Sequence, residues 1–147
     1  MYNTIKLAGH HWCYQLCRFN NELDLNAKPD VHVIKTLIYG VRTSGNQAEM
    51  AVRETAKLFK DDYPRVNEIV QKRLYMDDSF DGNRTYDETV KLTDDLQTVL
   101  SKGGFTLKGV TYSGHDPPEH LCNEDKVSVN VAGHKWFSKT HKYSLNI

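Results

Sequence analysis

The fold is decided by the stretch Lys72-Arg73-Leu74-Tyr75-Met76-Asp77-Asp78-Ser79-Phe80-Asp81-Gly82, in which two adjacent carboxylates follow a short apolar run. Arg73 to Met76 predict a strand, and the polar residues after it predict a tight turn. Carboxylates at such a tip can hold divalent cations. Because Asp-Asp before serine is also ordinary turn chemistry, the flanking sequence has to distinguish a metal site from a plain turn.

Two capping boxes predict a long helix on each side of this stretch. In each box a serine or threonine is followed three residues later by glutamine or glutamate, and apolar residues then recur at helical spacing. We predict helices over Ser44 to Lys60 and Thr85 to Lys102, the second stopped by Gly103-Gly104, and a short helical stretch around Val66 to Val70. The predicted inner faces are Ala48, Ala51, Val52, Thr55 and Phe59, and Leu92, Leu96, Val99 and Leu100.

Segments rich in aromatic and β-branched residues predict the strands. Trp12 to Phe19 and Val31 to Tyr39 should pair antiparallel across a long loop. Phe105 to Val110 is a further strand, and Val127 to Val131 with Lys135 to Tyr143 should form a final hairpin that turns at Gly133. Together with the two helices, these strands predict an α+β fold.

Length and composition indicate one globular domain. The chain has 147 residues, of which 39% are hydrophobic and 26% charged. The sequence contains no run of about 18 apolar residues, which would predict a membrane span, and its first residues lack the pattern of a signal peptide. The three cysteines, Cys13, Cys17 and Cys122, have no framework spacing, so we expect reduced thiols in an intracellular protein with no membrane partner.

The charge is balanced overall but uneven along the chain. A formal net charge of zero argues against a free-standing, strongly electrostatic nucleic-acid binder. From Lys126 to the end there are four lysines and several aromatic residues but no Asp or Glu. This tail would suit a surface that contacts a phosphate backbone, and a solvated lysine face is the alternative.

Four motifs follow one another along the chain, beginning at Tyr39, Tyr75, Gly103 and Ala132. In this order they resemble segments of reverse transcriptases, most closely those of BEL/Pao-type LTR retrotransposons. Tyr75-Met76-Asp77-Asp78 matches the family's Tyr-x-Asp-Asp box. Tyr39-Gly40-Val41-Arg42-Thr43-Ser44 is similar to the template- and nucleotide-contacting segment, although Gly45 stands where a proline is usual. Gly103-Gly104-Phe105-Thr106-Leu107-Lys108 and Ala132-Gly133-His134-Lys135-Trp136 resemble two segments that follow the box in the family.

The resemblance implies a polymerase palm, an antiparallel sheet with helices packed on one face in a ferredoxin-like arrangement. The enzyme would be an RNA-directed DNA polymerase that uses Mg²⁺, deoxynucleotides and a primed RNA or DNA template, as part of a pol polyprotein. By the same resemblance, the catalytic metal ligands would be Asp77 and Asp78. The nucleotide site would include Tyr2, Gly40, Ser44, Tyr75, Met76 and Lys108, and the primer would contact Gly133 and Trp136.

The resemblance also implies that one catalytic aspartate is missing. In the family this aspartate lies five residues before an aromatic residue, in a segment resembling Asp-x-x-x-Met-Tyr-Asn, and the chain opens at Met1-Tyr2-Asn3. We therefore expect residues 1–147 to be a partial palm domain without the upstream fingers and first catalytic strand. Such a fragment would be inactive alone, and its parent would work in the cytoplasm or a virus-like particle.

Three other interpretations remain open. Asp77-x-Ser79-x-Asp81-Gly82 followed by Glu88 has the spacing of an EF-hand calcium loop. Zinc binding would use residues that fit no compact pattern, namely Cys13, Cys17, His115, His120 and Cys122. The third interpretation is a non-catalytic, domesticated retroelement domain.

Overall fold

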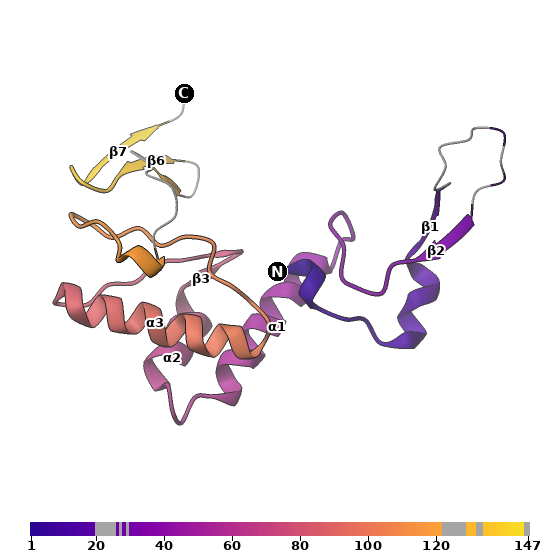
Figure 1. Cartoon of the computed structure of the whole chain (residues 1–147), viewed down its shortest axis with the longest axis horizontal. Coiled ribbons are helices and arrows are strands. Elements are labelled where there is room, and N and C mark those ends of the chain that lie inside the picture. Colours follow the sequence, from indigo (N-terminus) through magenta and orange to yellow (C-terminus); the bar gives the residue numbers. More distant parts are fainter. Residues whose placement is uncertain (20–25, 27, 29, 122–128, 132–133, 146–147) are drawn as a thin grey trace.

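The computed structural model describes residues 1–19, 26, 28, 30–121, 129–131 and 134–145 (Figure 1). Three α-helices occupy the middle of the chain, and short antiparallel strands lie before, between and after them. Short 3₁₀ helices occur at η1 (Tyr2–Thr4), η2 (Gly9–Tyr14) and η3 (Glu119–Leu121). The chain is therefore an α+β protein, as its sequence predicts.

The core is built where the three helices meet. They are α1 (Ser44–Leu58), α2 (Pro64–Arg73) and α3 (Tyr86–Lys102). Their apolar faces form one buried cluster, to which the residue after the Gly-Gly stop of α3 also contributes, consisting of Val52, Ala56, Val66, Val70, Val99, Leu100 and Phe105. Residues from the start of the chain pack on the same cluster, namely Met1 and Ile5. Burial of these apolar surfaces is the main force that holds the helices together.

The first helix begins almost as predicted, but its cap differs. Thr43 is the N-cap residue and Ser44 is the first residue of α1, only 2% exposed. The Ser44 hydroxyl does not cap the helix, because the side chain is buried rather than turned back over the first turn. The Gln47 amide Nε2 donates instead to Thr43 Oγ1 at 3.3 Å. The helix ends at Leu58, two residues before the predicted Lys60.

The third helix confirms its predicted bounds and its cap. Thr85 is the N-cap residue, and its hydroxyl accepts a hydrogen bond from Glu88 N at 3.3 Å. Gly103 and Gly104 end the helix, and Gly104 has a φ of +75°, which an L side chain rarely adopts. A Cβ at Gly104 would lie 2.8 Å from Thr4 Cγ2, so this stop also lets residues 1–5 approach the core.

The second helix is longer than predicted. It runs over Pro64–Arg73 rather than Val66 to Val70, and proline at its first position fits because a helix needs no donor there. Arg53 of α1 donates to Gln71 O of α2, and Gln71 Nε2 donates back to Arg53 O at 2.9 Å. These reciprocal bonds fix the pair α1–α2.

The N-terminal strands pair as predicted but are shorter. Strand β1 (Leu16–Phe19) is antiparallel to β2 (Asp30–Val33), with Leu16 opposite Val33. The predicted strand residues before Leu16 form η2 instead, in which Trp12 Nε1 donates to Leu7 O. Figure 1 shows this ribbon standing away from the helices.

The C-terminal segment forms three strands rather than one hairpin. Strands β5 (Val129–Val131), β6 (His134–Phe137) and β7 (Lys142–Leu145) follow one another in an antiparallel sheet. The predicted arm Lys135 to Tyr143 was wrong as a single strand, because residues 138–141 turn back and His141 adopts a φ of +53°. The predicted turn at Gly133 lies outside the described residues.

Phe105 to Val110 is not a strand, contrary to the prediction. The segment has no ladder partner among the described residues, and its backbone is held by α3 instead, since Gln97 Oε1 accepts from Leu107 N at 3.0 Å. Phe105 is buried in the helical core and Leu107 packs on it. The apolar residues therefore serve the helices rather than a sheet.

The described strands form three separate antiparallel sheets, β1–β2, β3–β4 and β5–β6–β7. The single antiparallel sheet that we expected is not formed by these residues. Figure 1 shows residues 105–121 between α3 and the β5–β7 sheet. Within the described ranges, no helix is long and apolar enough to cross a bilayer.

Candidate functional site

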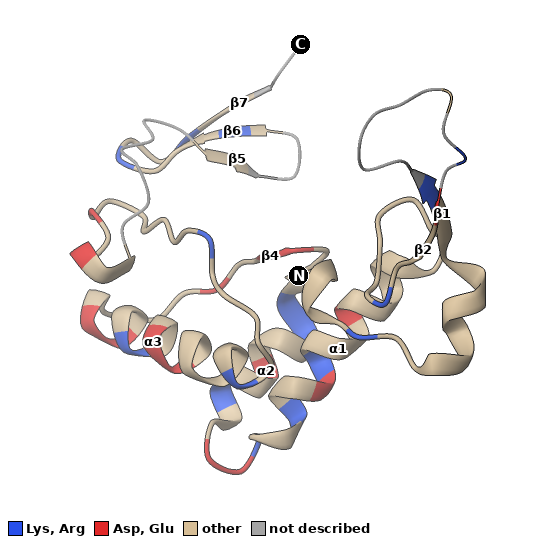
Figure 2. Cartoon of the chain, turned by 45° about the vertical axis from the view of Figure 1, so that its right-hand side comes forward, with Lys and Arg blue, Asp and Glu red and all other residues tan. Residues whose placement is uncertain are grey.

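The adjacent carboxylates lie on a two-residue hairpin. Strands β3 (Leu74–Tyr75) and β4 (Asp78–Ser79) pair antiparallel with Tyr75 opposite Asp78, so Met76 and Asp77 form the turn. Met76 has a φ of +54°, as expected at the first turn position of the hairpin turns that fit strand twist. Such a conformation is uncommon for a side chain of this size. Figure 2 shows the acidic residues at β4.

The hairpin is exposed. Tyr75 and Met76 are 58% and 65% exposed, and Asp77 and Asp78 are both open to solvent. Partial burial of the Asp78 carboxyl raises its pKa, and the charge of Asp77 raises it further. Two neighbouring carboxylates that repel each other are a natural donor pair for a hard cation, which would offset that repulsion.

A second group of predicted site residues meets at the start of α1. The rings of Tyr2 and Tyr39 lie 4.1 Å apart between centroids, and Gly40 follows with a φ of +87°. A Cβ at Gly45 would lie 3.8 Å from the Tyr2 hydroxyl oxygen, so Tyr2 also reaches the first turn of α1. Buried Ser44 Oγ has no hydrogen-bond partner among the described residues. The structure thus brings Tyr2, Gly40 and Ser44 into one region.

The hairpin and this region lie on the same side of the molecule. Leu74 of β3 packs on the same core cluster as Met1 and Ile5. Figures 1 and 2 both show the β3–β4 hairpin beside the first residues of the chain. The hairpin backbone therefore lies near the first residues of the chain.

Other predicted site residues are not joined to the hairpin. Lys108 is exposed on the irregular segment after α3, and no ion pair within the described residues links it to Asp77 or Asp78. Trp136 lies on β6, where its ring stacks on that of Tyr143 with centroids 6.3 Å apart. Gly133 lies outside the described residues.

One acidic residue near the hairpin was not predicted to belong to this site. Asp81 follows β4, and its side chain is only 8% exposed. It accepts from Arg65 Nη2 at 2.7 Å and from Arg73 Nη1 at 2.5 Å. The sequence contains no local signal for this cluster, because the partners lie eight and sixteen residues away.

The cluster argues against the EF-hand interpretation. A calcium loop would need the Asp81 carboxylate as a ligand, but each of its oxygens accepts a hydrogen bond from an arginine. The segment before Asp77 is a strand, whereas an EF-hand loop follows a helix directly. In the part of the chain that the structure describes, no group of three or more His, Cys, Asp or Glu side chains is placed to hold a metal ion.

The zinc interpretation finds no support in the side-chain contacts. Cys13 Sγ donates to His10 O, and Cys17 Sγ donates to His32 O, so the two thiols have separate partners. His120 Nε2 bonds Asp94 Oδ1 at 2.9 Å. Cys122 lies outside the described residues.

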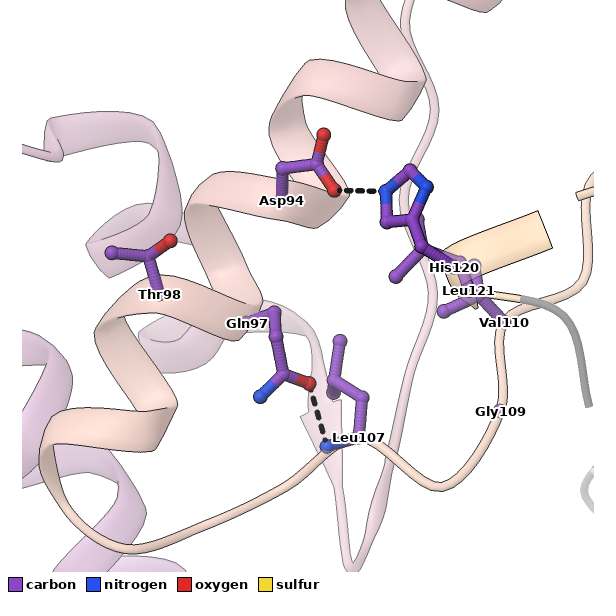
Figure 3. A pocket seen from close by; sticks show the side chains of 8 residues that line it. All are labelled: Asp94, Gln97, Thr98, Leu107, Gly109, Val110, His120 and Leu121. Carbon is purple, nitrogen blue, oxygen red and sulfur yellow. Dashed lines mark hydrogen bonds and ion pairs between the residues drawn. The ribbon is translucent and has the colours of Figure 1, made fainter. Parts of the chain in front are cut away.

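A cavity of about 290 Å³ lies between α3, residues 107–110 and η3 (Figure 3). Its lining combines apolar side chains with the Asp94–His120 pair, and Gln97 holds the backbone at its floor. Both polar contacts join α3 to the segment that crosses it. The Asp94–His120 contact attaches η3 to α3, and the Gln97–Leu107 contact attaches the start of the segment.

No protein-family model, no curated protein and no solved structure matches the chain. Function must therefore be inferred from the residues and their geometry.

Proposed function

We propose that the chain forms part of the palm of an RNA-directed DNA polymerase of the BEL/Pao-type reverse transcriptase family. The observation that carries this proposal is the β3–β4 hairpin, in which Tyr75 pairs with Asp78 and Asp77 lies in the two-residue turn between them. A tight hairpin holds adjacent carboxylates close together, and its exposure leaves both accessible to a cation and a substrate.

The region at the start of α1 supports the same proposal. Tyr2 and Tyr39 present aromatic rings beside Gly40, and nothing lies within 4 Å of where a Cβ of Gly40 would be, so the backbone is open at that point. Aromatic faces of this kind can bound the sugar and base of a nucleotide. In our proposal Tyr2, Gly40, Ser44, Tyr75 and Met76 shape the nucleotide site.

Asp77 and Asp78 would hold Mg²⁺, because carboxylate oxygens are the ligands that this ion prefers. When bound, the metal would supply activation of the primer's 3′ hydroxyl and stabilisation of the leaving group. The chain's own contribution is to keep the two carboxylates adjacent and exposed at the hairpin. Lys108 would meet the triphosphate, and Trp136 with Gly133 would support the primer.

The proposal includes a further metal-binding carboxylate from outside this sequence, because the resemblance leaves the family's first aspartate without a counterpart here. The chain alone is then expected not to extend a primer. Its partners in the whole enzyme would be a primed RNA or DNA template, deoxynucleotides and the rest of the pol polyprotein.

Metal binding by the chain tests the hairpin directly. Mn²⁺ broadens NMR signals of nearby amides, so the Asp77 and Asp78 signals should broaden first in a titration. The double variant Asp77→Asn/Asp78→Asn should abolish this effect. The matched control is Asp61→Asn/Asp62→Asn, a second exposed Asp-Asp pair between α1 and α2, which should leave it unchanged. Equal loss in both variants would show nonspecific binding and contradict the proposal.

Primer extension tests the proposed polymerase activity and its need for a further carboxylate. A longer chain that joins these residues to a segment bearing the family's first aspartate should extend a primed template in the presence of Mg²⁺ and deoxynucleotides, and Asp77→Asn should abolish the extension. Extension by the unmodified chain alone would contradict the need for another carboxylate. Metal binding without extension by the longer chain would favour a non-catalytic, domesticated domain.

A further inference from the structure

The hairpin that carries Asp77 and Asp78 is closed at its base by ion pairs. Arg73 is the last residue of α2 and immediately precedes β3, whereas Asp81 comes two residues after β4. The Arg73 guanidinium contacts Asp81 Oδ1 at 2.5 Å. The two arms of the hairpin are thus joined by side chains just beyond the last paired residues, Leu74 and Ser79.

The same carboxylate attaches the hairpin to α2. Arg65 contacts Asp81 Oδ2 at 2.7 Å, and it lies eight residues before Arg73, which is roughly two helical turns. Contacts at two points along one helix fix the direction of the hairpin as well as its closure. The Asp81 side chain is only 8% exposed, so these ion pairs are screened less by solvent than surface pairs are.

We propose that Asp81 is a positioning residue, which through Arg65 and Arg73 holds the β3–β4 hairpin against α2 so that Asp77 and Asp78 are presented to a metal ion. This inference rests on the metal-binding role proposed for the hairpin tip. Asp81 is not itself a ligand, because both of its oxygens accept from guanidinium groups. The arginines also neutralise its charge and leave the tip as the negatively charged part of the hairpin.

Glu68 provides a matched control for this arrangement. It contacts Arg65 at 2.7 Å, nearly the same distance as Asp81, but it lies on α2 itself and touches no hairpin residue among the described contacts. Glu68→Gln therefore removes a partner of the same arginine without releasing the hairpin. A mere change of charge near Arg65 would affect both variants alike.

The experiment is a Mn²⁺ titration of the full chain, followed by broadening of the Asp77 and Asp78 amide signals. Loss of a group that hydrogen-bonds a metal ligand directly typically weakens metal affinity by about 10- to 100-fold. Asp81 acts through Arg65 and Arg73 and not on Asp77 or Asp78 themselves, so we expect Asp81→Asn to weaken Mn²⁺ binding by less than about 10-fold. Arg73→Gln should weaken binding less, because Arg65 still holds Asp81. Glu68→Gln should bind as the wild type does.

A second control separates positioning from a general loss of stability. Thr85→Ala removes the cap of α3 and lowers stability without touching the hairpin, so its Mn²⁺ affinity should remain that of the wild type. If Asp81→Asn does not fold, the exposed Arg73→Gln variant carries the test. Wild-type affinity in a folded Asp81→Asn or Arg73→Gln chain, or equal weakening in Glu68→Gln, would overturn the positioning role of Asp81. Neither result would contradict the proposed function. Absence of Mn²⁺ binding at the wild-type tip would refute the proposed function and the inference with it.

Discussion

Replacing Gly103 by alanine should destabilise the protein through one identifiable contact. Gly103 lies where the end of α3 passes α1, and a Cβ there would be 2.6 Å from Thr55 Oγ1 and 2.7 Å from Thr55 Cγ2. The φ of Gly103 is −89°, which alanine adopts readily, so the backbone contributes no penalty. The steric overlap should outweigh the gain of about 0.4–1 kcal/mol that alanine brings by restricting the unfolded chain.

The magnitude follows from the size of the overlap. Adding a methyl group to a closely packed contact typically costs about 1–3 kcal/mol, and separations below 3 Å place Gly103→Ala in the upper half of that range. Thr55→Ala removes both overlapping atoms, leaving Phe105 Cδ2 at 3.0 Å as the nearest neighbour. The double variant should therefore recover most of the loss, with a coupling energy of about 1–2 kcal/mol.

Urea denaturation followed by circular dichroism at 222 nm measures all four corners of this cycle. Thr55→Ala also removes the hydrogen bond from Thr55 Oγ1 to Ala51 O. The free energy of unfolding of this single variant is therefore measured separately and included in the cycle. Additive effects of the two substitutions, within experimental error, would refute the argument that Thr55 is the obstacle. Unchanged stability in Gly103→Ala would refute the close approach of α3 to α1.

Three other predictions concern the core, a helix cap and alkaline pH. Ile69→Ala should lower the free energy of unfolding by about 2–5 kcal/mol in urea melts, because Ile69 is 2% exposed, whereas Leu58→Ala, at a site 79% exposed, should change it little. Thr85→Ala should lower it by about 1 kcal/mol in the same assay, and Thr85→Ser should restore most of that loss. Burial raises the pKa of Tyr112, so the folded chain retains this proton more tightly than the unfolded chain does, and stability should fall as the pH rises above about 10. Urea midpoints between about pH 8 and 11 should show a shallower fall in Tyr112→Phe, and an identical fall would contradict the assignment to this phenol.

The helices could be predicted because their signals are local. Thr85 and Glu88 form a cap within one turn, and the apolar spacing behind each capping box matches a buried face. The cap of α1 was missed by one residue, since Ser44 suits a cap in type but is buried in position. Whether Ser44 is buried depends on how the helices pack together, and a local sequence pattern does not contain that information.

The strands were predicted less well because a strand needs a partner. Phe105 to Val110 has strand composition, yet its backbone is held by the Gln97 side chain and its apolar residues join the helical core. The strand predicted over Arg73 to Met76 is shorter, because Arg73 ends α2 and Met76 lies in the turn. The predicted turn is present, and its two residues set the pairing of Leu74–Tyr75 with Asp78–Ser79.

Part of the candidate site was predictable for the same reason. The Asp77–Asp78 tip follows from adjacent residues, whereas the ion pairs of Asp81 depend on how α2 and the hairpin meet in space. The contact between Tyr2 and Tyr39 likewise joins segments far apart in the sequence. A single sequence carries no direct record of such contacts.

The ribbon β1–β2, which stands away from the helices, has a consequence for hydrogen exchange. Side chains on its exposed face are 40–56% accessible, namely Leu16, Val31 and Val33, so opening the ribbon exposes little new apolar surface. Its amides should exchange through local opening at a small free-energy cost, whereas those of α1 and α3 should exchange only when the shared core unfolds. The chain should therefore show two tiers of amide protection, and the low tier should be insensitive to Ile69→Ala.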